Sequence, residues 1–112
     1  MLTLTVTADD FGYCKLRNKG ILQLLKQGSI TRTSLIVNAV NTTDAVTDFC
    51  YHVNSQERIG LHLNLTEGKP LSDVKEILSL TNKCGHFLGK HGFRDELRKG
   101  NIVETEVRLK VN

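Results

Sequence analysis

The feature that most constrains the fold is an alternation of strand-like and helix-like segments across residues 1–65. Apolar residues alternate with threonines in Met1–Ala8, as in a half-buried strand. Two further runs rich in apolar and β-branched residues, Ser29–Asn38 and Arg58–Leu65, read as strands as well. A strand-helix-strand-helix-strand order predicts a parallel sheet with right-handed helical crossovers.

The two helix-like segments carry their own boundary signals. Asn18 is a plausible N-cap of the first helix, and Gly28 is placed to end it. Thr42 or Thr43 can cap the second helix. The apolar faces expected to point inward are Ile21, Leu22, Leu24 and Leu25 in the first helix and Ala45, Val46, Phe49 and Val53 in the second.

Beyond Gly68 the pattern loosens, and shorter elements are expected. A hairpin turning at Asn82–Gly85 is predicted, followed by one short helix within Gly92–Gly100 and a second helix from Ile102 onward. At 112 residues the chain is one domain at most.

The composition argues against two classes of function, nucleic-acid binding and membrane insertion. The net charge is only +3, and basic residues near the C-terminus are interleaved with acidic ones, which is typical of a solvated surface and not of a nucleic-acid interface. No run approaches the roughly 18 apolar residues of a membrane span, and the N-terminus reads as a strand and not as a signal peptide. Three widely spaced cysteines indicate reduced thiols, so we expect a cytoplasmic protein.

Residues able to do chemistry stand at the predicted strand ends. Asp9 and Asp10 end the first strand, His62 and Asn64 lie late in the third, and Glu67 follows in the next loop. Function in parallel α/β folds gathers at the carboxyl ends of the strands. Asp10 and His62 could therefore share a divalent cation, which would leave Asp9 free to act as a base.

Other interpretations of these residues stay open at this point. The acid pair could serve capping and solvation, and His62 could be a packed strand residue. A phospho-receiver domain also has adjacent acids after its first strand, but it needs an aspartate at the end of its third strand, where this chain has His62 and Asn64. The spacing of Cys84, His86 and His91 matches no zinc pattern, and Cys14 is better explained as a small packed thiol.

Four stretches, "TADDFGYC", "SLIVN", "GLHLNLTEG" and "FLGKHGF", occur in an order and at distances that resemble the YdjC-like carbohydrate deacetylases. The resemblance runs from about Leu2 to the end of the chain. It implies a distorted (β/α) barrel, of which residues 1–112 would supply an incomplete N-terminal βαβαβ part. The chain would then be the N-terminal part of a single deacetylase-like domain whose C-terminal remainder is absent.

The resemblance also implies an activity, the metal-dependent removal of acetyl groups from N-acetylated carbohydrates of the chito-oligosaccharide type. Asp9 matches the proton acceptor that activates water, and Asp10 and His62 match two metal ligands. Mg²⁺ is the expected cation, with Zn²⁺ as the alternative. The family's third ligand is a histidine in a later motif that this chain lacks.

The implied partner is an acetylated oligosaccharide, with no nucleic acid and no membrane, and a homodimer is left open. Two alternatives remain. One is a truncated, inactive fragment that acts at most as a metal-binding or partner-binding module. The other is an unrelated small α/β module.

Overall fold

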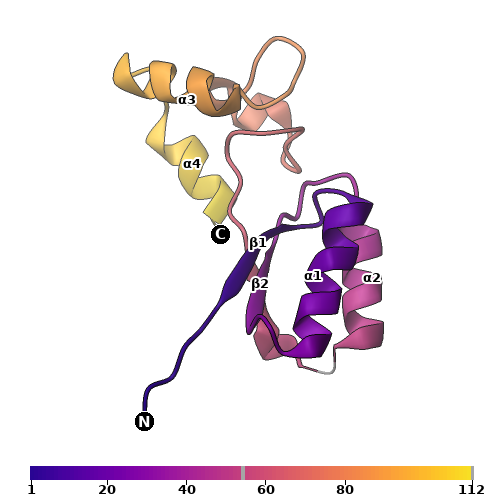
Figure 1. Ribbon diagram of the computed structural model, residues 1–112. Helices are drawn as coiled ribbons and strands as arrows, with labels where there is room; N and C mark the ends of the chain where they lie inside the picture. The colour runs from indigo at the N-terminus through magenta and orange to yellow at the C-terminus, as the bar shows by residue number, and fades with distance from the viewer. Residues whose placement is uncertain (54, 112) are drawn as a thin grey trace. The chain divides into compact units, whose positions relative to one another are not determined.

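The computed structural model describes residues 1–53 and 55–111, with side chains described as far as residue 108. The chain divides into two compact units, Met1–His62 and Leu63–Asn112. The first unit contains a parallel three-stranded sheet in the order β1-β2-β3 (Figure 1). Its elements are β1 (Thr7–Phe11), α1 (Lys15–Gln27), β2 (Arg32–Leu35), α2 (Thr42–His52), a 3₁₀ turn (Gln56–Arg58) and β3 (Ile59–Leu61). The predicted α/β class and parallel sheet are thereby confirmed.

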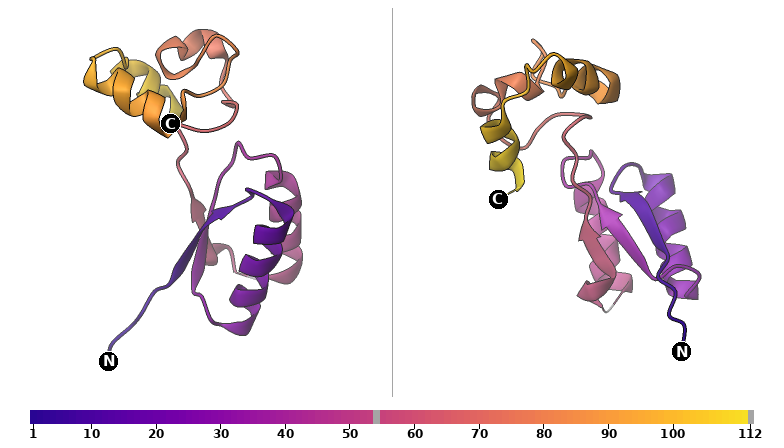
Figure 2. Two further views of the ribbon diagram at one scale, coloured as in Figure 1. Left: turned by 45° about the horizontal axis from the view of Figure 1, so that its top comes forward. Right: turned by 90° about the vertical axis from the view of Figure 1, so that its left-hand side faces the viewer.

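Both long helices of this unit cover the same face of the sheet (Figure 2). Their apolar faces form the core with strand residues, and Phe11 of β1 packs edge-to-face on Phe49 of α2, with ring centroids 6.1 Å apart. Each fully buried side chain of this size contributes about 1.5–3 kcal/mol. The buried core residues are Phe11, Ile21, Leu22, Leu25, Ile30, Ala45, Phe49 and Val53. One face of the sheet is thus fixed against helices, which leaves the other face for polar residues.

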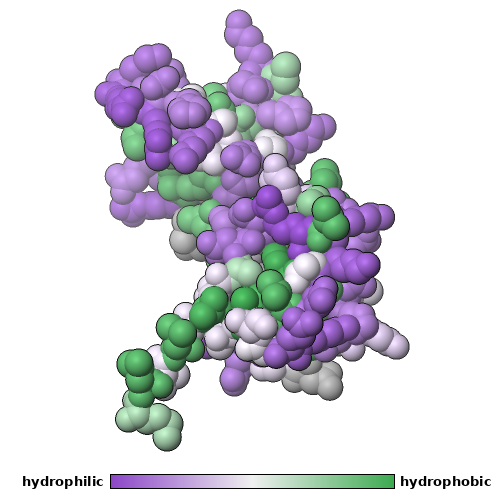
Figure 3. Space-filling view, viewed as in Figure 1, coloured by the Kyte–Doolittle hydropathy of each residue, from purple (hydrophilic) through white to green (hydrophobic). Residues whose placement is uncertain are grey.

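The first strand begins later than the sequence predicts. Strand β1 starts at Thr7, and Leu2, with 97% of its surface exposed, lies in the N-terminal segment that extends beyond the sheet. Figure 1 shows this segment running away from β1, and the same projecting segment is mostly hydrophobic in Figure 3. The reason is the length of the neighbouring strand. The amide groups of Thr31 and Arg32 both donate to the carbonyl of Val6, at the point where the chain turns into β2.

The other two strands are also shorter than Ser29–Asn38 and Arg58–Leu65. Residues 29 and 30 lie just after α1 and are still bonded to its last turn, because both of their amide groups donate to the carbonyl of Leu24. After β2 the Thr42 hydroxyl donates to the carbonyls of Ile36 and Ala39 and holds the chain in a turn toward α2. Strand β3 ends at Leu61, so Asn64 lies outside the strand in which it was predicted.

Helix α1 begins at Lys15, so the prediction that Asn18 caps it is wrong. Asn18 lies inside the helix with 3% of its surface exposed, and its amide connects two loops. Its Oδ1 accepts from the amide of Gly12 at 2.8 Å, and its Nδ2 donates to the carbonyl of Asn41 at 3.4 Å. The helix end is as predicted, because Gly28 adopts a left-handed φ of 74° and its amide donates into the last turn.

Helix α2 begins at Thr42 with Asn41 in the capping position, so the prediction that Thr42 or Thr43 caps it is wrong. Thr42 is its first residue, but its hydroxyl donates to preceding carbonyls and does not accept from the first turn. Ala45, Phe49 and Val53 are buried as predicted, whereas Val46 is exposed.

The second unit is built from short elements around a small core. Its helices are α3 (Gly89–Arg98) and α4 (Glu104–Val111), and two 3₁₀ turns precede them at Val74–Glu76 and Leu78–Leu80. The predicted hairpin is a single antiparallel bridge between Thr81 and Phe87, closed by a turn at Asn82–Gly85. The buried core residues of the second unit are Ile77, Leu80 and Phe87.

In the second unit Ser79 anchors the last helix. Oε2 of Glu106 accepts from both the amide and the hydroxyl of Ser79, at 2.8 and 2.6 Å. The hydroxyl oxygen in turn accepts from the amide of Val103 at 3.0 Å. Along the described part of the chain, no helix is long and apolar enough to cross a membrane.

Candidate metal-binding and catalytic site

The two adjacent acids lie in an irregular step of β1. The register with β2 shifts between Ala8 and Phe11, so that Asp9 and Asp10 together face one residue of β2, Ser34. Two residues opposite one is the pattern of a β-bulge. Strict alternation after Ala8 would send Asp10 toward the helices and Phe11 away from them. The extra residue returns Phe11 to the core and leaves both carboxylates off the helix-covered face.

Asp10 carries the backbone distortion of the bulge. Its φ of +66° is the only positive value at a non-glycine position among the described residues. Aspartate is one of the few residues that tolerate this region. Gly12 follows with φ +98°, and a Cβ there would meet the carbonyl of Ile36 and the hydroxyl of Thr42, each at 3.1 Å. The strain therefore lies at the strand end that carries the acids, where functional sites commonly keep it.

Asp10 lies between the guanidinium group of Arg17 and the imidazole ring of His62. Nη1 of Arg17 lies 2.7 Å from its Oδ2, and Nδ1 of His62 lies 3.6 Å from its Oδ1. The side chains of Arg17 and Asp10 are 43% and 40% exposed, so the pair contributes no more than about 1 kcal/mol. The Arg17 guanidinium also lies over the ring of Tyr13 at 4.4 Å, which holds it beside the carboxylate.

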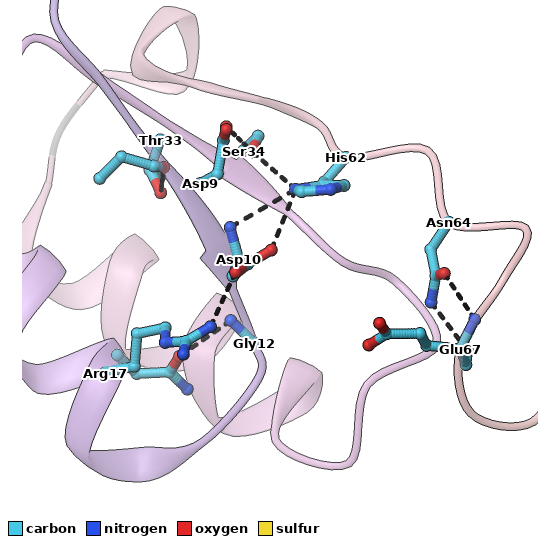
Figure 4. Close-up of polar contacts among 11 residues, drawn as sticks. Asp9, Asp10, Gly12, Arg17, Thr33, Ser34, His62, Asn64 and Glu67 are labelled. Atoms are coloured by element: carbon cyan, nitrogen blue, oxygen red, sulfur yellow. Dashed lines mark hydrogen bonds and ion pairs between the residues drawn. The ribbon is translucent and has the colours of Figure 1, made fainter. Parts of the chain in front are cut away.

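Asp9 is connected to His62 through the hydroxyl of Ser34. Oγ of Ser34 donates to Oδ1 of Asp9 at 2.7 Å and lies 3.1 Å from Nδ1 of His62 (Figure 4). The His62 ring lies beside Ser34 because the hydrogen-bond ladder between β2 and β3 continues for one bond beyond Leu61. In this bond the amide of His62 donates to the carbonyl of Leu35 at 2.8 Å. The first unit thus brings Asp9, Asp10 and His62 together, as predicted from their strand ends.

The remaining predicted polar residues lie in the second unit. Asn64 closes its own loop, because its Oδ1 accepts from the amides of Thr66 and Glu67 and its Nδ2 donates to the carbonyl of Glu67. His86 contacts the carbonyl of Cys84 through its ring at 3.2 Å. No group of three or more His, Cys, Asp and Glu side chains suited to a metal ion occurs among the described residues.

Two residues of the site were not found from the sequence, Ser34 and Arg17. Ser34 stands in the quoted stretch "SLIVN", and alternation along that strand places it on the polar face. Its position opposite two carboxylates follows from the bulge, which has no signal of its own in the sequence. Arg17 would have needed the true start of α1 at Lys15.

The donor chemistry of the site fits a divalent cation. A carboxylate and an imidazole side by side are donors that Zn²⁺ and Mn²⁺ accept, and the carboxylate suits Mg²⁺ as well. Among the described residues no hydrogen bond engages Nε2 of His62, so this nitrogen is available as a donor. Two donors do not complete a coordination shell, so further ligands would have to come from water or from additional protein residues.

Comparison with known proteins gives consistent matches over nearly the whole chain. A family model described as YdjC-like protein matches residues 3–112. A carbohydrate deacetylase of Danio rerio is 46% identical, covering 97% of this chain and 35% of the relative. One of Homo sapiens is 40% identical, covering 96% and 32%. A chitooligosaccharide deacetylase of Yersinia enterocolitica is 29% identical, covering 90% and 39%.

A solved structure shares the fold of the chain. It is a crystal structure from Enterococcus faecalis V583, provisionally described as a cellobiose-phosphate cleavage protein, with a TM-score of 0.80 and 25% identity over 95% of this chain and 39% of the other. The chain spans about a third of the length of the first curated relatives it matches.

Proposed function

Because this chain belongs to the YdjC-like protein family, we propose that it is the N-terminal part of a carbohydrate deacetylase, a metal-dependent hydrolase. The observation that supports this most directly is the bulge in β1. It turns two adjacent carboxylates to one face of the sheet, beside the ring of His62. Relatives named carbohydrate and chitooligosaccharide deacetylase support an N-acetylated oligosaccharide as the substrate.

The site residues would divide the work. Asp10 and His62 would hold the cation, together with a ligand from the part of the relatives' length that this chain does not span. A divalent cation bound there would polarise the acetamide carbonyl and favour ionisation of a water molecule. Asp9 would accept the proton of that water. Its Oδ1 is held by Ser34, which leaves Oδ2 as the accepting atom.

Mg²⁺ is the proposed cation and Zn²⁺ the alternative, because an imidazole ligand shifts preference toward the softer metal. The fold of the whole protein would be a distorted (β/α) barrel of which the first unit forms three neighbouring strands. Three parallel strands in sequential order, with both helices on one face, support this arrangement. Cytoplasmic location and homodimer formation stay predictions.

The proposal can be tested with a chimera in which this chain is continued by the remaining residues of the Danio rerio relative. We expect the chimera to release acetate from N-acetylated chito-oligosaccharide. Activity should disappear on chelation and return when a divalent cation is added. The unmodified relative is the positive control, and a folded chimera that releases no acetate would contradict the proposal.

Substitutions in the chimera separate the proposed roles. Asp10→Ala and His62→Ala should weaken cation binding, seen as a higher cation concentration needed for half-maximal rate. Asp9→Asn should lower kcat by about 10²–10⁴-fold, the usual contribution of a positioned base, while the cation requirement stays the same. Undiminished turnover in Asp9→Asn would remove Asp9 as the base.

A second candidate function follows from the two-ligand set of the described residues. The 112-residue chain by itself would bind a cation weakly and would not turn over substrate. Binding of Mn²⁺ to this chain, followed by paramagnetic broadening of His62 resonances, measures this directly. Acetate release by the 112-residue chain alone would contradict it.

A further inference from the structure

We propose that Ser34 is a positioning residue that fixes both the orientation of Asp9 and the tautomer of His62. Ser34 lies in the central strand β2, opposite the bulge formed by Asp9 and Asp10 and next to β3. It is half-buried, and its hydroxyl lies between the proposed base and a proposed cation ligand (Figure 4). This inference rests on the proposed function for the meaning of those two roles, but its geometry does not depend on them.

The hydrogen count at the hydroxyl sets the direction of each contact. A serine hydroxyl has one hydrogen to donate, and an ionised carboxylate can only accept. The 2.7 Å contact with Oδ1 of Asp9 therefore takes that hydrogen. Toward Nδ1 of His62, 3.1 Å away, Ser34 can then act only as an acceptor, so this contact is a hydrogen bond when Nδ1 carries a proton.

A competing contact exists and is weaker. The backbone amide of Asp10 lies 3.4 Å from the same Nδ1 and could donate to it only if that nitrogen carried a lone pair. Its 3.4 Å length makes it the longer of the two contacts at Nδ1, since Oγ of Ser34 lies 3.1 Å away, and hydrogen bonds weaken as they lengthen. Oδ1 of Asp10, 3.6 Å from Nδ1, adds negative charge on the same side and also favours a proton there. The two oxygens together outweigh the long amide contact.

A proton on Nδ1 leaves the lone pair of the neutral ring on Nε2. A metal-binding histidine is commonly oriented by such a hydrogen bond from its other nitrogen, and loss of the partner costs about 10- to 100-fold in metal affinity. The same hydroxyl holds one oxygen of Asp9 and so directs the other toward solvent and substrate. Ser34 thereby sets the nitrogen that binds the cation and the oxygen that takes the proton.

The test is the ring ¹⁵N spectrum of His62 in the metal-free 112-residue chain, with the imidazole neutral. We expect the Nδ1–H tautomer in the wild type and a shift toward Nε2–H in Ser34→Ala. Ser34→Thr keeps the hydroxyl and should keep the wild-type tautomer. Thr33→Val is the matched control. It removes the neighbouring hydroxyl, which donates to the carbonyl of Ala8 at 2.7 Å, and should leave the His62 tautomer unchanged.

Zn²⁺ added to the same samples gives a second readout. It should shift Nε2 of His62 in the wild type, and Ser34→Ala should need about 10- to 100-fold more Zn²⁺ for the same shift. An Nε2–H tautomer in the wild type, or an unchanged tautomer in folded Ser34→Ala, would overturn the inference. A chimera without acetate release but with the expected tautomers would overturn the proposed function and leave the role of Ser34 intact.

Discussion

Asp10 has two properties that are rarely combined, a left-handed backbone and a charged side chain paired with Arg17. The side chain is half-exposed and its ion pair is screened by solvent, so the pair contributes little to stability. The backbone conformation matters more, because residues with a branched Cβ are strongly disfavoured at positive φ. Replacement of Asp10 should therefore affect stability through the shape of the new residue more than through its charge.

We predict that Asp10→Val is less stable than Asp10→Asn by about 1–2 kcal/mol. Both substitutions remove the charge, so their difference isolates the backbone term. Urea denaturation measures it as a lower midpoint for the valine variant with an unchanged slope. Equal midpoints would mean that the left-handed conformation is absent in solution.

At this scale the sequence was sufficient to predict which polar residues of the strand ends lie close together. Asp9, Asp10 and His62 were predicted to gather, and the structure brings them together. Ser34 could not be found in the same way, since its role depends on facing two residues of β1 at once. A register shift depends on how two strands that are distant in the sequence pair with each other, so no local sequence pattern predicts it.

Among the elements, α1 shows how a local signal can serve a distant contact. Asn18 has the residue type of an N-cap, but it lies within α1 and connects the loops that follow β1 and β2. The backbone amide of Gly12 donates to Oδ1 of Asn18 in a buried position. Loss of the Asn18 side chain would therefore leave this buried donor without a partner. Asn18 thus stabilises the loop that follows the acid pair.

We predict that Asn18→Ala lowers the free energy of unfolding by about 1–3 kcal/mol, the desolvation cost of one buried group. Gln23→Ala, at an exposed position of the same helix, should change it by less than about 0.5 kcal/mol. Thermal or urea unfolding of the two variants provides the comparison. Equal effects would show that the bridge contributes nothing beyond helix propensity.

The ends of the elements divide into those set locally and those set by neighbours. Gly28 ends α1 through its own left-handed conformation, and a glycine at this place in the sequence already indicates a helix end. The strands are shorter than their apolar runs because each lasts only as long as its partner. Thus β1 starts where the chain turns into β2, although Leu2 and Leu4 continue the alternation.

At the scale of the whole molecule, the first unit has an apolar groove beside β3. It is lined by residues of α2, of the 3₁₀ turn before β3, and of the central strand β2 and the edge strand β3, and Cys50 is among them. Leu61 of β3 is 64% exposed. We expect the part of the relatives' length that this chain does not span to cover this groove.

The reactivity of the Cys50 thiol measures whether the groove is covered. In a variant with Cys14→Ser and Cys84→Ser, the remaining thiol should react readily with a maleimide in the 112-residue chain. In the chimera with the Danio rerio continuation we expect the rate to fall by about tenfold or more, because thiol reactivity follows access. The rate in denaturant serves as the reference for both proteins. Equal rates in the folded proteins would contradict coverage of the groove.

The α/β class and the parallel sheet were predictable because they follow from the order of the segments, which survives errors in their boundaries. The division into two units at His62 was not, because no composition change marks it. Completion of the proposed metal site would depend on ligands that the described residues do not supply.

The bulge in β1 has a consequence for how this stretch can change by single-codon deletion. Removal of either aspartate would restore one-to-one pairing with β2, because Ala8 and Phe11 would then be separated by one residue, as their partners Thr33 and Leu35 are. The strand and its core contacts would survive, and one acidic side chain would remain on the polar face. An in-frame loss of three nucleotides would thus remove one of the two proposed site carboxylates while leaving the architecture of the first unit intact.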